Sequence, residues 1–255
     1  MKNRLLYSIA ALFILVSVSL FVYPNLSKQA VQKKNDAVIE QFDDKVDDVR
    51  EGDHKKAVED GVINDDGYLV DDSGKVVSDY PVVFKKDLDR LYSDSKAYNN
   101  ALKERQDLNV DFSRAALDLS DYGIYDGIYG YIKAPTIGLN IPICLGAGEN
   151  NMARGGAHLM NTSLPIGGKS TNAAIAGHTG YFGRTVFDNI PRLSEGDKVS
   201  VTNYFATLNY RVISKKEIVS SETNDIYIVK DKDLLTLITC ARMGKSRYEV
   251  ICERV

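Results

Sequence analysis

The sequence is poor in the features on which several large classes of function depend. Its formal net charge is only −3, which gives no reason to expect a nucleic-acid partner. It contains no zinc-finger, phosphate-loop or dinucleotide-binding motif. Cysteine and histidine each occur three times, so chemistry by a thiol or an imidazole has very few candidates.

Long hydrophobic runs are also scarce, since only one occurs, at residues 5–23. The run contains no charged residue. Its length of 19 residues is close to the ~20 residues that span a bilayer as a helix. Lys2 and Arg4 precede the run, which favours a cytoplasmic N-terminus and an extracytoplasmic remainder. A cleaved signal peptide is the alternative, but its apolar core is usually ~7–15 residues long. We therefore expect residues 1–27 to form a single-pass signal anchor, a retained transmembrane helix.

The three cysteines differ in their surroundings. Outside the membrane a disulfide is permitted, but the odd count leaves at least one thiol unpaired within the chain. Cys144 and Cys252 lie inside apolar runs, so we expect both to be small buried hydrophobic residues, and whether they pair is left open. Cys240 instead ends the run "LLTLITC", at a rim that a substrate can reach.

The segment that follows the apolar run is acidic. Between residues 36 and 79 there are 15 Asp and Glu against five Lys and Arg, mixed with turn signals. We expect a solvated stalk in which His54 lies on the surface. Residues 86–105 space their apolar side chains at three and four, which predicts a helix with Asp87 as its N-cap. Residues 28–121 are therefore interpreted as an acidic stalk and N-terminal helical region.

From about residue 122 to residue 255 the pattern changes to short apolar or alternating runs separated by turn residues. Eight short strands in this stretch favour an all-β sandwich or closed barrel over alternating strands and helices. One helical turn is expected between strands within residues 148–158, and another within residues 183–190. The runs that predict strands are residues 128–134, 139–145, 171–177, 198–205, 208–219, 225–229, 234–240 and 247–255.

Two residues at other strand ends could act with the Cys240 thiol. His178 ends a small-residue strand in "AIAGHTG", whereas His158 is more typical of a structural histidine that bonds a loop. Arg247 opens the next strand, where a hairpin would bring it close to Cys240. A guanidinium can hold a developing oxyanion, and Arg242 in the connecting loop is the second candidate for this role.

Short motifs in this region resemble those of the sortase family of Gram-positive bacteria. The sortase pattern TLxTC is matched by "TLITC", residues 236–240, with "AGHTG" ending 60 residues before the cysteine and Arg247 following it. The element "GAHLMNTSLPIGG" resembles the pilin-polymerising branch, class C. The resemblance covers residues 122–255.

The resemblance implies a closed eight-stranded sortase-type β-barrel with short peripheral helices, and a cysteine transpeptidase activity. It makes Cys240 the nucleophile, His178 the general acid/base and Arg247 the group that steadies the intermediate. The substrates would be surface or pilin proteins with an LPxTG-like sorting signal. The acceptor would be an amine, and no metal or cofactor is implied.

Two features usual in class C are missing. No Asp-Pro-aromatic tripeptide, the usual lid motif, occurs in the sequence, and no second membrane helix follows the last expected strand. The class is therefore left open, together with the acceptor, which is either a pilin lysine or a cell-wall peptide amine.

Two other functions compete with this interpretation. One is a different extracytoplasmic Cys-His enzyme, although a papain-like peptidase places its cysteine before its histidine. An L,D-transpeptidase shares the order found here but would want a Ser-x-Gly-Cys sequence around the thiol. The other is a membrane-tethered domain that binds a partner without catalysis, which predicts an unreactive Cys240 thiol.

Overall fold

A computed structural model describes residues 2–179, 187–219, 224–241 and 246–255. The side chains of Cys240, of Ala241 and of most residues before Leu26 lie outside this description. The helices are α1 (Lys2–Asp47), α2 (His54–Glu59), α3 (Lys85–Glu104) and α4 (Glu149–Arg154), with short 3-10 helices η1 (Leu119–Tyr122), η2 (Pro135–Ile137), η3 (Ile190–Arg192) and η4 (Asn224–Ile226). The strands are β1 (Ile128–Ala134), β2 (Leu139–Leu145), β3 (Gly156–His158), β4 (Thr171–Gly177), β5 (Lys198–Asn203), β6 (Thr207–Val219), β7 (Asp233–Ala241) and β8 (Ser246–Arg254).

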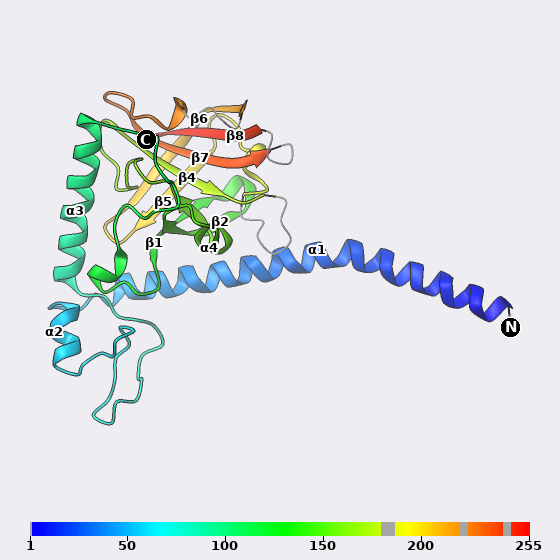
Figure 1. Ribbon diagram of the computed structural model, residues 1–255, viewed down its shortest axis with the longest axis horizontal. Coiled ribbons are helices and arrows are strands. Elements are labelled where there is room, and N and C mark those ends of the chain that lie inside the picture. Colours follow the sequence, from blue (N-terminus) through cyan, green and yellow to red (C-terminus); the bar gives the residue numbers. More distant parts are fainter. Residues whose placement is uncertain (1, 180–186, 220–223, 242–245) are drawn as a thin grey trace.

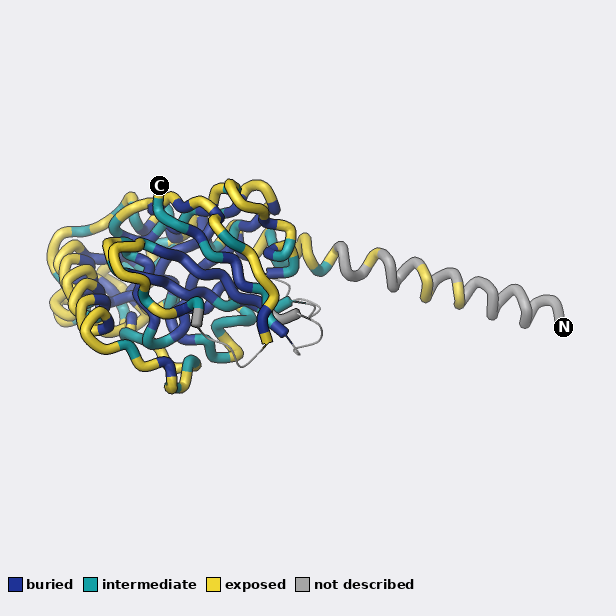
Figure 2. The backbone as a smooth tube through the Cα atoms, turned by 90° about the horizontal axis from the view of Figure 1, so that it is seen from above, coloured by how far each residue is buried: buried dark blue, intermediate teal, exposed yellow. Residues whose placement is uncertain are grey.

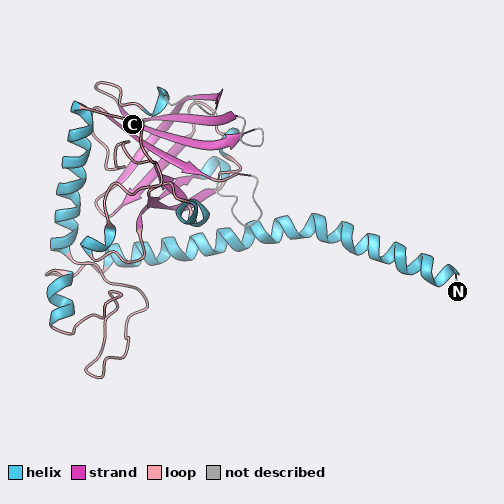
Figure 3. Ribbon diagram, in the orientation of Figure 1, coloured by secondary structure: helices cyan, strands magenta, loops and turns pink. Residues whose placement is uncertain are grey.

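The eight strands close into one barrel, as predicted, in the order β1-β2-β3-β4-β7-β8-β6-β5 (Figure 1). The pairs β2–β3 and β4–β7 are parallel, and the other pairs are antiparallel. Short helices lie around the barrel (Figure 3). The fold class inferred from the strand pattern is therefore confirmed.

Alternating burial along the strands explains why the sheet curls around its own core. In β5, and in β6 as far as Val212, every second residue is buried, as expected for strands with one face inside. Side chains from all the long strands meet in the barrel interior, together with three residues that follow β4. This interior cluster includes Ile132, Ile143, Ile175, Phe187, Val201, Val212, Leu237 and Val250.

Seven of the eight expected strands form, with ends shifted by up to two residues. The prediction for residues 225–229 is wrong, because this stretch begins within η4 and continues as a loop. Its carbonyl groups at Asp225 and Tyr227 accept hydrogen bonds from the Asn172 side chain rather than from a strand. The eighth strand is instead β3, which follows the predicted helical turn, α4, and pairs with both β2 and β4.

The C-terminal half of α1 lies against the barrel, whereas its N-terminal half extends away from it (Figures 1 and 2). Ile39 and Phe42 are buried in a cluster with residues of α3 and β1. Lys45 is only 2% exposed, and its Nζ pairs with the Asp126 carboxylate and bonds Tyr204 Oη at 3.3 Å. This part of the expected stalk is therefore packed rather than solvated.

The helix predicted at residues 86–105 is α3, but its N-cap is Phe84 and not Asp87. The Asp87 carboxylate accepts from the His54 backbone N–H at 2.7 Å and lies 3.0 Å from His54 Nδ1. His54 is consequently buried, which corrects its expected surface position. Both predictions failed because a neighbouring segment supplies the partner, and local sequence does not reveal such a partner.

The uncharged run 5–23 lies within α1, so its helical conformation agrees with the prediction. Among the residues that the structure describes, no helix combines the length and the apolar character needed to cross a membrane.

We expect Phe42→Ala to weaken the fold because Phe42 is 1% exposed and packs edge-on against Tyr131. Emptying such an aromatic site costs ~3–5 kcal/mol of unfolding free energy. Urea unfolding of the full chain in detergent, followed by circular dichroism, measures the loss. Phe13, which is 67% exposed, provides the matched control, and Phe13→Ala should change the unfolding free energy by less than ~0.5 kcal/mol. Equal unfolding midpoints for the two variants would contradict the packing described for α1.

Candidate active site

The ends of three neighbouring strands bring the three predicted site residues to one edge of the barrel. In the parallel pair β4–β7, Gly177 is the register partner of Thr239. His178 directly follows Gly177, and Cys240 directly follows Thr239, so the two residues are neighbours across the pair. In the antiparallel pair β7–β8, Cys240 is the register partner of Arg247. The backbone positions 178, 240 and 247 are thus adjacent, although far apart in sequence.

The threonines of the "TLITC" motif hold β7 in register with β4. Thr239 is 2% exposed, and its Oγ1 donates to the Gly177 carbonyl oxygen at 3.0 Å. Thr236 is fully buried, and its Oγ1 donates to Asn172 Oδ1 at 2.9 Å. Leu237 between them points into the barrel core. The motif residues before the cysteine therefore have structural partners that position residue 240.

The backbone around His178 is fixed by the residues that come after the loop. Phe187 N–H donates to the His178 carbonyl oxygen at 2.9 Å, and Thr179 Oγ1 donates to Asp188 Oδ1 at 2.8 Å. A Cβ atom on Gly177 would lie 2.6 Å from Cγ of the Phe187 ring, so only glycine allows this close packing. The His178 side chain itself is half-buried.

Arg247 is half-buried, and its positive charge acts on the Glu249 carboxyl. The expected antiparallel pairing of β7 with β8 is present, and Arg247 is the second residue of β8. The Cys240 side chain lies outside the described residues, as does Arg242, the second candidate for the oxyanion donor. The register thus fixes where the backbone of residue 240 lies but not the direction of its sulfur atom.

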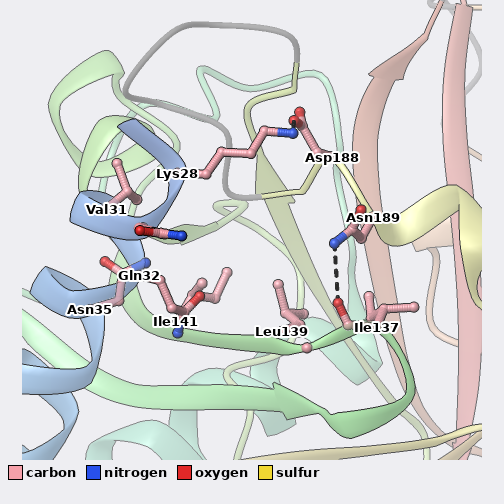
Figure 4. A pocket seen from close by; sticks show the side chains of 11 residues that line it. Lys28, Val31, Gln32, Asn35, Ile137, Leu139, Ile141, Asp188 and Asn189 are labelled. Carbon is pink, nitrogen blue, oxygen red and sulfur yellow. Dashed lines mark hydrogen bonds and ion pairs between the residues drawn. The ribbon is translucent and has the colours of Figure 1, made fainter. Parts of the chain in front are cut away.

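Helix α1 reaches the loop that follows His178. Lys28 Nζ lies 3.0 Å from Asp188 Oδ2, and Asn189 Nδ2 donates to the Ile137 carbonyl oxygen at 3.1 Å. Figure 4 shows these side chains around a pocket between α1 and the barrel, next to Leu139 and Ile141 of β2. Of the described side chains, those that line this pocket include neither His178 nor Arg247, so we do not assign it to the active site.

A segment that precedes η1 covers the outer face of β4 and β7. Leu108 and Phe112 pack with Ala176 and Ile238, which lie two residues before His178 and Cys240. The Gln106 side chain ties the segment down, because it donates to the Ile226 carbonyl oxygen and accepts from Ile228 N–H. Access to this face is therefore restricted by residues that carry no recognised lid motif.

The remaining cysteines and the third histidine have structural environments, as predicted. Cys144 and Cys252 are 1% and 0% exposed and are not in a disulfide. Burial raises the pKa of the two thiols to about 11 and about 12, respectively. His158 is fully buried, its Nε2 lies 3.0 Å from the Ser163 carbonyl oxygen, and burial lowers its pKa to about 4. A group with this pKa is neutral at pH 7.

Sequence analysis missed one charged residue of the same edge, Glu249 of β8. It is buried, being 1% exposed, and it lies two positions after Arg247 on the same face of the strand. The alternation of "RYEVICERV" carried this signal, because Val250 and Cys252 face the core and place Glu249 with Arg247 on the outside.

Comparison with known proteins agrees with the motifs. A sequence model of the sortase domain matches residues 132–255. The crystal structure described as Group B Streptococcus Pilus Island 1 sortase C2 is 31% identical, with a TM-score of 0.60 over 67% of this chain and 98% of that one. The chain belongs to the sortase family.

Other sortases are also similar to this chain. Sortase C1 of Streptococcus agalactiae, solved in complex with MTSET, is 27% identical with a TM-score of 0.60 and covers 67% of this chain and 91% of that one. Sortase A of Bacillus anthracis is 29% identical over 127 residues, or 48% of this chain. The match spans 58% of that curated relative. These similarities include both the A and C types, so they do not decide the class.

We expect a thiol-alkylating reagent to modify the native sortase chain at Cys240 alone. Cys144 and Cys252 are buried and their raised pKa values leave almost no thiolate at pH 7.5. Peptide mapping by mass spectrometry after brief exposure to iodoacetamide measures the label at each site, and urea-unfolded chain, labelled at all three, is the control. Label on Cys144 or Cys252 of the folded chain would show that these environments are described wrongly.

Proposed function

We propose that this sortase is a membrane-anchored cysteine transpeptidase in which Cys240 is the nucleophile, His178 the general acid/base and Arg247 the oxyanion donor. The observation that carries the proposal is the strand register. It makes residues 178, 240 and 247 neighbours at one edge of β4, β7 and β8. A thiol, an imidazole and a guanidinium from these positions can serve a single peptide carbonyl.

In the first step the Cys240 thiolate attacks the carbonyl carbon of the scissile peptide bond. The carbonyl oxygen becomes an oxyanion, and the Arg247 guanidinium stabilises its charge. The C–N bond then breaks, and the departing amine takes a proton from the His178 imidazolium. The products are a thioester on Cys240, a neutral imidazole and a released amine.

In the second step an amine attacks the thioester carbonyl carbon. The neutral His178 imidazole accepts the proton that the attacking nitrogen loses, and the C–S bond breaks to return the Cys240 thiolate. A new amide is formed, and the enzyme regains its starting protonation state. Both steps are displacements that need neither a metal nor a redox cofactor.

We infer that the substrates are surface or pilin proteins with an LPxTG-like sorting signal, cut between Thr and Gly. This substrate class is supported by membership of the sortase family and by the motif residues 236–240. The acceptor is either a pilin lysine or a cell-wall peptide amine. The names of the similar structures mention a pilus island, whereas the curated relatives include a sortase A.

Membrane anchoring is part of the same proposal. The uncharged run 5–23 has the length of a bilayer span, and Lys2 and Arg4 before it favour a cytoplasmic N-terminus. This orientation makes the barrel extracytoplasmic, where sorting signals of exported proteins are exposed. Extraction of the chain from membranes by detergent but not by alkaline carbonate tests the anchor.

Substitution of the nucleophile is the most direct test of the proposed chemistry. Cys240→Ala removes the only attacking atom, so we expect no acyl-enzyme and no transfer product. Mass spectrometry of the full chain after incubation with an LPxTG-type peptide and either a lysine peptide or a cell-wall stem peptide detects both species. Cys144→Ala, at a buried cysteine outside the site, should retain transfer. Turnover by Cys240→Ala would refute the assignment.

We expect Arg247→Ala to lower kcat by ~10²–10³-fold, the usual cost of losing one oxyanion donor, with a much smaller change in KM. The reason is that an oxyanion exists only in the transition state and the intermediate. Arg254→Ala, a substitution on the same strand at its far end, is the control. A kcat for Arg247→Ala equal to that of the control would remove Arg247 from the mechanism.

A further inference from the structure

Glu249 is an unusual residue to find beside the proposed oxyanion donor. Its side chain is 1% exposed, and it lies opposite Ile238 of β7, two residues before Cys240. Residues two apart on a strand point to the same side and are separated by ~6.6 Å, so the Glu249 carboxyl is within reach of the Arg247 guanidinium. A carboxylate is rarely buried without a partner that stabilises its negative charge.

Glu249 shares a hydrogen bond with the Asp225 carboxyl of η4. Two carboxyl groups can bond in this way only when one of them carries a proton. Lys216 of β6 is the register partner of Glu249, and its ammonium pairs with Asp225. The second oxygen, Glu249 Oε2, is buried and has no hydrogen-bond partner among the described residues.

The opposite pKa shifts of the two carboxyl groups favour the shared proton on Glu249. Burial raises the pKa of its carboxyl to about 8, and the hydrogen bond and negative charge of Asp225 act in the same direction, whereas Lys216 and Arg247 oppose them. For Asp225 burial alone would raise the pKa, but the hydrogen bond from Glu249 and the Lys216 ammonium lower it. Among the described residues, the charged groups that act on Glu249 are Asp225 from η4, Lys216 from β6 and Arg247 from β8, while Ile238 from β7 adds none.

We propose that Glu249 is a positioning residue for Arg247, and that the charge of its carboxyl group decides whether the guanidinium is available to the substrate carbonyl. A neutral Glu249 leaves the positive charge of Arg247 uncompensated, so the guanidinium can bind the oxyanion. An ionised Glu249 is an anion that is always present on the same strand as Arg247, whereas the substrate oxyanion forms only during the reaction. The ionised carboxylate therefore pairs with the guanidinium in place of the substrate. This inference rests on the role proposed above for Arg247.

Proton loss from Glu249 therefore gives the transpeptidase an alkaline limit of its own. We expect kcat of the full chain to fall above pH ~8 by up to about tenfold per pH unit, because the ionised form has lost its oxyanion donor. Glu249→Gln mimics the neutral carboxyl, so the part of the fall that Glu249 causes should be absent from its profile. Asp225→Asn removes the neighbouring negative charge, so the Glu249 pKa decreases and the fall should begin at a lower pH.

The experiment measures kcat for an LPxTG-type peptide between pH 6 and pH 10 for the parent chain and these two variants. Glu253→Gln is the matched control, because Glu253 lies on the same face of β8 as Glu249. Its carboxylate pairs with Lys232 and not with Arg247. A second measurement follows the Arg247 side-chain Nε–H signal by NMR over the same pH range. It should shift with the Glu249 titration in the parent chain and stay constant in Glu249→Gln.

The two variants should change the pH profile of kcat in opposite ways, which distinguishes a positioning role from a merely structural one. A structural role would lower kcat in both variants without moving the pH at which kcat falls. Coincident profiles for the parent chain and Glu249→Gln in an active enzyme, or an Arg247 signal that ignores the substitution, would overturn the role of Glu249 alone. A parent chain that turns over no sorting peptide at any pH would instead refute the proposed function, and the role of Glu249 with it.

Discussion

The parallel pairing of β4 with β7 is the constraint on which the site depends. Parallel strands bring their C-terminal ends to the same edge of a sheet, so one register decides whether positions 178 and 240 are neighbours. A one-residue slip would turn every outward side chain of β7 into the core. The hydrogen bonds from Thr239 to β4's last carbonyl group and from Thr236 to Asn172 oppose such a slip.

Local sequence patterns were sufficient to predict most strands of the barrel. They failed where contacts between distant segments decide the conformation. Alternation and turn residues locate the long strands, because burial of one face has a period of two in the sequence itself. The three-residue strand β3 is too short to show that period. The stretch after Asn224 alternates like a strand, but Ile226 packs on the outer face and the neighbouring carbonyl groups bond Asn172.

The site shows the same division between local and tertiary information. Motif resemblance indicated Cys240, His178 and Arg247, and the register brings their backbones together, while their catalytic roles stay predictions. Glu249 could be placed on the outer face by alternation, but nothing in its own segment reveals Asp225, 24 residues earlier in the chain. Charge states of buried groups depend on such distant partners, so they require a three-dimensional structure.

Helix α1 continues without a break from the uncharged run to Asp47, and it lies along the barrel over its second half (Figure 1). Lys28, which pairs with Asp188, lies only five positions after Tyr23, the last residue of that run. At a rise of ~1.5 Å per residue this is a spacer of ~8 Å. With the run in a bilayer, as proposed, this short spacing holds the barrel close to the membrane surface, so the proposed substrates would reach it within a thin layer above the lipid headgroups.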